Sequence, residues 1–305
     1  METAKNKTLI VIVGPTAVGK TAMAIKLAQE FSTEIISADS RQFYRELKIG
    51  VASPSFEELS LARHHFIGNL SIHDTYNVSK YETEALQCID KIFKTKETAV
   101  LVGGSGLYID AVCKGIDELP DPEEALREDI KYLFATEGLD ALRSQLRILD
   151  PVYYNEVDLA NPKRLMRAIE VCLTSGKPYS SLRVNQQTAR NFTILKIGLN
   201  CERERLYAII NHRVDLMLEM GLLNEVKELL AYKEANALNT VGYKELFTYL
   251  EEKCSLAEAV EKIKTNSRRY AKRQLTWFKR YDDITWFDAN NHIEVIDYLK
   301  IQLNK

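Results

Sequence analysis

Residues 9–21 read LIVIVGPTAVGKT and decide the fold, because an apolar run leads directly into a turn bounded by glycines. The run Leu9–Val13 has the composition of a buried β-strand, and an amphipathic helical pattern extends from Lys20 to about Phe31. The octapeptide that links them follows G-x-x-x-x-G-K-T, which indicates a phosphate-binding loop when it stands between a strand and a helix. It consists of Gly14, Pro15, Thr16, Ala17, Val18, Gly19, Lys20 and Thr21.

The residue types in this loop suit an anionic ligand. Gly14 and Gly19 allow the backbone to wrap around a phosphate, Lys20 adds a positive charge, and Thr21 offers a hydroxyl to Mg²⁺. The N-terminus of the following helix adds the positive end of its dipole. The alternative is a glycine turn that merely precedes a helix. We predict that the chain binds a di- or triphosphate together with Mg²⁺.

Length and composition are those of a soluble globular protein. The chain has 305 residues, 46% of them hydrophobic and 28% charged, and a net charge of -2. Its five cysteines are scattered and form no C-x-x-C pair, so neither a disulfide framework nor a zinc site is indicated. Residues 1–7 are polar, and no apolar run is long enough to span a bilayer. We expect a cytoplasmic monomer with no membrane partner.

Strand and helix patterns alternate in the first part of the chain. Apolar runs at 34–38 and 99–102 read as further strands, and the intervening helical pattern predicts a parallel sheet with right-handed crossovers. Residues 123–183 show helical periodicity without a convincing strand. A strand resumes at 194–199, and the remainder of the chain is predicted to be helical.

This pattern predicts an α/β fold in two parts. The first is a core like that of the P-loop NTPases, a parallel sheet with helices on both faces, formed by residues 1–120 and 193–305. The second is an all-helical domain inserted at residues 121–192. In such sheets, ligands bind beyond the carboxyl ends of the strands.

Two stretches of the chain are strongly basic. Seven cations between Lys163 and Lys196 stand against the single acid Glu170, and seven between Lys264 and Arg280 stand against none. Aromatic residues are interleaved with the second set. The alternatives are a solvated helix face and a surface that binds a polyanion such as a nucleic acid.

One acid lies where phosphate chemistry would need it. The strand at 99–102 ends in Gly103-Gly104-Ser105-Gly106 without a carboxylate, whereas the strand at 34–38 is followed by Asp39. Asp39 is therefore expected at the same sheet edge as Lys20. There it would help to hold a metal ion or accept a proton from a nucleophile, or it would only cap the next helix.

Seven short motifs follow one another along the chain. They are GPTAVGKT (14–21), ISADSRQFYR (36–45), VGGSGLY (102–108), NPKRLMRAIEV (161–171), RVDLML (213–218), VGYKE (241–245) and RYAKRQLTWF (269–278). In this order they resemble the motifs of the bacterial-type tRNA dimethylallyltransferases. The resemblance extends from Thr8 to about Phe287.

The resemblance implies an activity and a donor. Members of this family transfer a dimethylallyl group from dimethylallyl diphosphate to the exocyclic N6 of adenosine 37 in tRNA. The loop would then hold the leaving diphosphate rather than the γ-phosphate of ATP. Asp39 would be the base, Lys20 and Thr21 would complete the catalytic set, and Arg213 would lie near the diphosphate. An ion pair of Arg213 with Asp215 or Glu219 on its own helix is the alternative.

The resemblance also implies where tRNA binds. The side chains of Ser40, Arg41 and Gln42 would line, with Asp39, the path of the incoming nucleotide, and Ser105 stands where the family more often has threonine. The helical insertion would clamp the tRNA. Its predicted contacts are Arg127, Lys163, Arg164, Leu165, Met166 and Arg167. The pair His64-His65 matches a family motif that we interpret as structural.

Three other functions stay open on the sequence. A nucleotide or small-molecule kinase would need the phosphate loop but not the basic segments. An isopentenyltransferase for free adenine nucleotides would not need the insertion. A non-catalytic RNA-binding protein would not need Lys20, Thr21 and Asp39.

Overall fold

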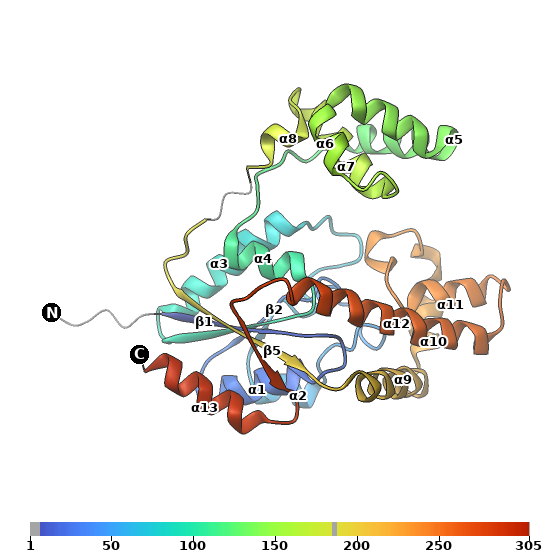
Figure 1. The fold of residues 1–305 in the computed structure, drawn as a ribbon. Helices are drawn as coiled ribbons and strands as arrows, with labels where there is room; N and C mark the ends of the chain where they lie inside the picture. Colours follow the sequence, from blue (N-terminus) through green and yellow to red (C-terminus); the bar gives the residue numbers. More distant parts are fainter. Residues whose placement is uncertain (1–6, 185–187, 305) are drawn as a thin grey trace. The chain divides into compact units, whose positions relative to one another are not determined.

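A computed structural model describes residues 7–184 and 188–304 of the chain. Within that part, the sheet has six parallel strands in the order β3-β2-β4-β1-β5-β6 (Figure 1). The strands are β1 (Thr8–Val13), β2 (Ile35–Ser37), β3 (His64–His65), β4 (Thr98–Val102), β5 (Thr193–Asn200) and β6 (Ile284–Asp288). β1 lies at the centre, and Val11 stands beside Leu101 of β4 and Lys196 of β5.

Helices cover both faces of this sheet, as predicted. The helices of the same unit are α1 (Lys20–Glu30), α2 (Phe56–Leu61), α3 (Val78–Phe93), α4 (Gly106–Lys114), α9 (Arg203–Glu219), α10 (Leu222–Glu228), α11 (Tyr243–Leu250), α12 (Leu256–Phe278) and α13 (His292–Leu303). Every residue of β1 and β4 is buried. This matches their uninterrupted apolar sequences, since a parallel strand packs on both sides.

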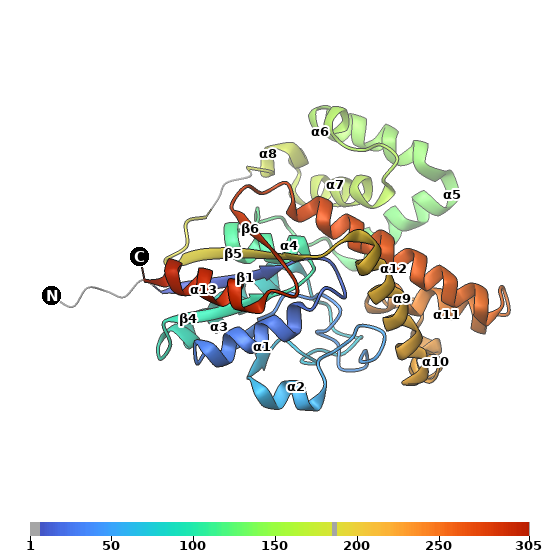
Figure 2. The same ribbon diagram turned by 60° about the horizontal axis from the view of Figure 1, so that its bottom comes forward.

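Two hydrophobic clusters occupy the two faces. On one face α1 and α13 lie side by side (Figure 2), where Leu27 packs with Leu299 in a common cluster. On the other face α3 and α4 pack with the end of α12, through residues such as Ile89, Ile109 and Phe278. A third cluster joins α9, α10, α11 and α12. The phosphate loop thus follows a strand, β1, whose two faces are both buried by these clusters.

The helix α12 begins at a reciprocal cap. The Ser255 hydroxyl accepts the Glu258 N–H at 3.3 Å, and the Glu258 carboxylate accepts the Ser255 N–H at 2.8 Å. This arrangement satisfies two backbone donors that the first turn of a helix leaves free. The sequence SLAE therefore fixes the start of a 23-residue helix that carries the second basic segment.

The chain divides into two compact units, which are described separately. One comprises residues 1–113 and 190–305, and the other is the segment Lys114–Ala189. These limits lie a few residues before the predicted limits of 121 and 192. The smaller unit contains α5 (Glu124–Leu149), α6 (Pro151–Glu156), α7 (Pro162–Ser175) and α8 (Tyr179–Leu182). They enclose a core that includes Leu142, Leu146 and Ile169.

The expectation of an entirely helical chain after residue 199 was wrong at β6. The segment Ile284–Asp288 pairs in parallel with Lys196–Asn200 of β5 and extends the sheet. Gly198 gives the Trp286 ring the room to pack there, since a Cβ at residue 198 would lie 2.5 Å from the Trp286 side chain. The strand depends on this distant partner, which explains why a local pattern did not reveal it.

Candidate active site

The phosphate loop connects β1 to α1 with a strained backbone. Gly14 has φ 149°, Ala17 has φ 67° and Gly19, the residue before α1, has φ 96°. The Gly14 backbone also approaches β5 so closely that a Cβ would lie 2.5 Å from the Leu199 carbonyl oxygen. Residues other than glycine rarely adopt positive φ, and such strain persists only where the surroundings hold it. The two glycines of the motif are therefore required by geometry.

The side chain of Lys20 folds back over the loop. Its Nζ donates to the carbonyl oxygens of Gly14 at 3.0 Å and Pro15 at 2.7 Å. Burial lowers the pKa of Lys20 to about 8, while the nearby Asp39 carboxylate raises it and Arg213 lowers it. A charge with so little solvent around it interacts strongly with an anion that enters the site.

Asp39 follows β2 and begins a turn rather than a helix. Its Oδ1 accepts the N–H of Arg41 at 3.0 Å. No helix starts at residues 40–42, so the helix-capping alternative for Asp39 was wrong. The carboxylate acts electrostatically on Lys20, on Arg213 and on Tyr270 of α12. It therefore stands in the same cluster of charges as the phosphate loop, as its position after β2 predicted.

Arg213 enters this cluster from α9. Burial lowers the pKa of its guanidinium, and Asp39 and Glu58 raise it. The alternative ion pair on its own helix does not form in the described part of the chain, where Asp215 instead binds Lys264 Nζ at 2.8 Å. Lys20, Asp39 and Arg213, from three separate segments, thus lie within electrostatic range of one another.

Two serines and a tyrosine border the Asp39 side of the site. The N–H of Ser40 donates to Ser105 Oγ at 3.1 Å, and the Ser105 hydroxyl donates to Ser40 Oγ at 3.2 Å. Burial together with Asp39 raises the pKa of Tyr270 to about 12, and Ser105 acts on the same phenol to lower it. Sequence reasoning did not name Tyr270 as a site residue, although it lies in the 269–278 motif.

The side chains of Arg41 and Gln42 form hydrogen bonds with backbone carbonyls of the protein itself. The Arg41 guanidinium donates to the carbonyl oxygens of Asn236 at 2.7 Å, Ala237 at 3.0 Å and Asn239 at 3.1 Å. Gln42 Nε2 donates to the Ala52 carbonyl at 2.9 Å. These bonds order the loops beside Asp39. A contact with tRNA remains a prediction for both residues.

The glycines of the 103–106 segment are explained by close approaches. A Cβ at Gly103 would lie 2.4 Å from the Ala38 carbonyl oxygen, next to Asp39, and one at Gly104 would lie 2.1 Å from Gln274 Nε2. One at Gly106 would lie 2.3 Å from Trp277. Backbone and α12 therefore press directly on this loop. Gln274 was not among the predicted site residues.

The predicted tRNA contacts of the smaller unit lie on α7 and, for Arg127, in the first turn of α5. Lys163 and Arg164 are exposed, whereas Leu165 is fully buried in the core of the unit. The Leu165 side chain therefore cannot reach a ligand and acts through packing, and Met166 is partly buried against the same core. Arg167 forms an ion pair with Glu170 at 3.6 Å.

Asp121 lies close to two of these cations. Its carboxylate is 3.7 Å from Arg127 and 4.0 Å from Arg167. Both arginines are thus partly neutralised in the free protein. Lys163 and Arg164 have no ion pair within the described residues.

In the second basic segment, some cations are already paired with other side chains and others are exposed. Lys264 binds Asp215, and Arg268 donates to the Asn211 side chain at 2.6 Å, so both anchor α12 to α9. Arg269, Lys272 and Arg273 are exposed. Of these five cations, Lys264 and Arg268 are thus already engaged on α9, and the exposed ones are Arg269, Lys272 and Arg273.

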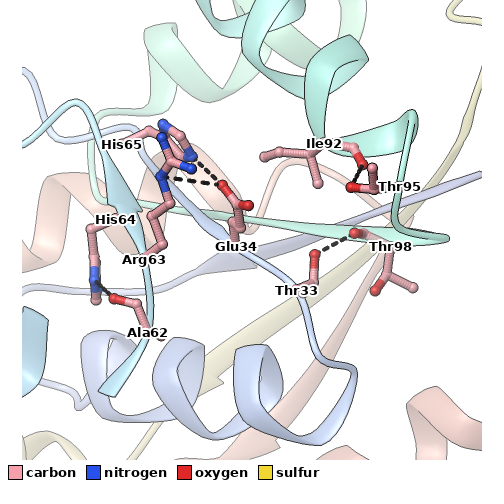
Figure 3. Close-up of polar contacts among 9 residues, drawn as sticks. All are labelled: Thr33, Glu34, Ala62, Arg63, His64, His65, Ile92, Thr95 and Thr98. Carbon is pink, nitrogen blue, oxygen red and sulfur yellow. Dashed lines mark hydrogen bonds and ion pairs between the residues drawn. The ribbon is translucent and has the colours of Figure 1, made fainter. Parts of the chain in front are cut away.

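A separate cavity lies at the other end of β2. Glu34 precedes β2, and its carboxylate is 2.6 Å from His65 Nε2 and 3.6 Å from Arg63 Nε (Figure 3). Glu34, Arg63 and His65 line a cavity of about 620 Å³ together with Cys88 and Lys91. His64 Nδ1 is bonded to the Ala62 carbonyl at 2.8 Å. These contacts fit the structural interpretation of the two histidines.

The fold and the site define a class of protein. A parallel sheet with a phosphate loop after its central strand and a helical unit inserted before β5 describes a P-loop-like α/β protein. No helix in the described part of the chain is long and apolar enough to cross a membrane.

Comparison with known proteins narrows this class. The family model of IPP transferases matches residues 42–281, and the chain belongs to this family. It is 50% identical over 295 residues to tRNA dimethylallyltransferase 1 of Bacteroides thetaiotaomicron, which covers 97% of this chain and 96% of that one. It is 48% identical over 297 residues to the tRNA dimethylallyltransferase of Christiangramia forsetii, with 97% and 98% covered.

Solved structures agree with this assignment. The full-length tRNA isopentenylpyrophosphate transferase of Bacillus halodurans superimposes with a TM-score of 0.73 at 34% identity, and the match covers 98% of this chain and 97% of that one. A eukaryotic dimethylallyltransferase captured acting on tRNA gives a TM-score of 0.76 at 27% identity, with 93% and 74% covered. The predicted fold class and family are thereby confirmed.

Proposed function

We propose that this chain transfers the dimethylallyl group of dimethylallyl diphosphate to N6 of adenosine 37 in tRNA. The observation that carries the proposal is the electrostatic cluster of Lys20, Arg213 and Asp39 in a member of the IPP transferase family. Two cations there suit a diphosphate, and a carboxylate beside them suits an amine nucleophile. A nucleotide kinase does not need the exposed cations of α7 and α12.

The reaction requires one bond to form and one to break. The N6 nitrogen attacks the allylic carbon, and the bond between this carbon and the diphosphate oxygen breaks with its electron pair on that oxygen. Lys20 and Arg213 are proposed to stabilise the charge that grows there. Asp39 is proposed to take the proton that N6 loses, because the amine lone pair is delocalised into the ring and attacks poorly without a base.

The residues present fit a role for Mg²⁺. This ion retains several waters and is usually held by one or two protein oxygens plus substrate phosphates. The described residues contain no group of three or more His, Cys, Asp or Glu side chains that would hold a metal by themselves. The Thr21 hydroxyl, one residue into α1, is the proposed protein ligand. Mg²⁺ bound there would screen the charge of the diphosphate.

tRNA is proposed to bind through cations and through the loops beside Asp39. Lys163, Arg164 and Arg167 with Arg127 would hold phosphates in the smaller unit, and Arg269, Lys272 and Arg273 would do so on α12. Ser40 and Ser105 would meet the extruded nucleotide. Extrusion costs a few kcal/mol, which phosphate contacts and stacking offset. We further propose that the enzyme works in the cytoplasm as a monomer without a membrane partner.

The direct experiment is incubation with dimethylallyl diphosphate and unmodified tRNA, followed by mass analysis of the nucleosides. We expect a prenylated adenosine that requires both substrates and disappears in EDTA. Prenylation of AMP but not tRNA would identify an enzyme for free nucleotides. ATP hydrolysis without prenylation would restore the kinase alternative. Full activity in EDTA would exclude the proposed metal.

A further inference from the structure

The side chain of Gln274 joins two loops of the site. It lies on α12 and is only 5% exposed. Its Oε1 accepts the backbone N–H of Thr16 in the phosphate loop at 2.7 Å, and its Nε2 donates to the Gly104 carbonyl at 3.0 Å. One buried amide therefore connects the loop after β1 with the loop after β4.

The phosphate loop needs such support from outside. Its backbone is strained at Ala17, whose φ is 67°, and Lys20 holds the loop from within, through the Gly14 and Pro15 carbonyls. Gln274 adds the opposite contact at Thr16. A strained segment keeps its conformation only when several contacts fix it, and each buried N–H left unpaired costs free energy.

The chemistry of the contact selects an amide. The Thr16 N–H can only donate and the Gly104 carbonyl can only accept, so the bridging group must accept at one end and donate at the other. A carboxylate would satisfy Thr16 but repel Gly104, and a thioether would satisfy neither well. The space is also restricted, since a Cβ at Gly104 would collide with the amide at 2.1 Å.

The loop at Gly104 leads to the acceptor side. Ser105 Oγ accepts the N–H of Ser40, the neighbour of Asp39, at 3.1 Å, and the Ser105 hydroxyl donates to Ser40 Oγ at 3.2 Å. We infer that Gln274 is a positioning residue that sets the diphosphate loop in register with the Ser105–Asp39 side of the site. This inference rests on the proposed function for its catalytic consequence. Its effect on the phosphate loop does not depend on turnover.

The test compares Gln274→Met and Gln274→Glu with a control on the same helix. Asn266 also lies on α12, and its Nδ2 donates to Glu245 Oε1 at 2.7 Å. This hydrogen bond lies outside the two loops that Gln274 joins. Asn266→Ala thus weakens the anchoring of α12 without unpairing Thr16 or Gly104. Melting temperatures of all variants establish that they fold.

Two measurements follow on the full-length protein. We expect Gln274→Met to weaken the binding of inorganic diphosphate by about ten-fold in calorimetry and to lower kcat/KM for dimethylallyl diphosphate by at least that factor, while the tRNA Kd is unchanged. Asn266→Ala should leave both values near wild type. Unchanged diphosphate affinity in folded Gln274→Met would overturn the inference. Absent prenylation by the wild type would instead count against the proposed function, and the diphosphate measurement would still decide the role of Gln274.

The pH profile of Gln274→Glu separates positioning from general stability. When protonated, the substituted carboxyl group can again accept from Thr16 and donate to Gly104, so the variant should recover as pH falls. The comparison is made below pH 8, where Lys20, with a pKa of about 8 that a carboxylate at 274 would only raise, is protonated in both proteins. There the ratio of the kcat/KM of the variant to that of wild type reports the group at 274. A ratio that rises toward acid supports the bridging role. A ratio independent of pH contradicts it.

Discussion

The phosphate-loop region and the helical unit of residues 114–189 hold their charges in opposite ways. In the first, Lys20 is bonded to two loop carbonyls and Asp39 to the Arg41 N–H, and both lie in a poorly solvated cluster with Arg213. In the second, Lys163 and Arg164 are exposed on α7. Fixed and partly buried groups suit chemistry, which depends on geometry. Open cations suit a polyanion, which depends on counterion release.

Among the variants that test this difference, Asp39→Asn is expected to lose the most turnover. The amide keeps the shape of the side chain but cannot accept the N6 proton, so we expect turnover to fall by about two to four orders of magnitude. The tRNA Kd should stay near wild type, because the tRNA phosphates are proposed to be held by cations elsewhere in the protein. Single-turnover prenylation and filter binding measure the two quantities. Turnover within a few-fold of wild type would show that Asp39 is not the base.

Lys20→Ala should produce the next largest loss. The variant removes the ammonium that is proposed to face the diphosphate, and loss of one such electrostatic contact typically costs about 10²–10³ in rate. It also leaves the Gly14 and Pro15 carbonyls without their donor. Donor KM and kcat are both expected to worsen, whereas tRNA binding is not. A variant that loses tRNA affinity equally would remove the distinction between the two regions.

A pH effect follows from the same lysine. Its pKa in the fold is about 8, below the ordinary 10.5, so in the free enzyme the ammonium is lost as pH rises through about 8. We expect kcat/KM for the donor to fall about ten-fold per pH unit above that value, since kcat/KM reports the free enzyme. In Lys20→Arg this limb should move out of the accessible range because a guanidinium stays protonated. A wild-type profile that is flat to pH 10 would contradict the assignment.

The sequence predicted the parts of this site that depend on local order. G-x-x-x-x-G-K-T after an apolar run located the loop, and parallel topology placed Asp39 at the same edge, because consecutive strands end together. It did not reveal Gln274, whose partner Thr16 is 258 residues away, nor β6, which forms only on β5. It also suggested more free cations on α12 than the structure has, because composition cannot show that Lys264 and Arg268 are already bound to α9.

The smallest effect concerns the exposed cations. Each phosphate contact that is removed should flatten the slope of log affinity against log salt by about 0.7 to 0.9. Arg164→Ala should therefore weaken tRNA binding and reduce the slope by about one contact, while diphosphate affinity measured without tRNA is unchanged. Arg167→Ala should change the slope less, because Glu170 and Asp121 already neutralise part of the Arg167 charge.

Arg147 provides the matched control for these two variants. It is an exposed arginine on α5 of the same unit and was not assigned to tRNA. Arg147→Ala should leave both the affinity and the slope as in wild type. Equal slopes for all three variants would mean that the unit contributes only a diffuse field. Loss of diphosphate binding in Arg164→Ala would place that arginine in the active site and end the separation between a fixed catalytic region and an open electrostatic one.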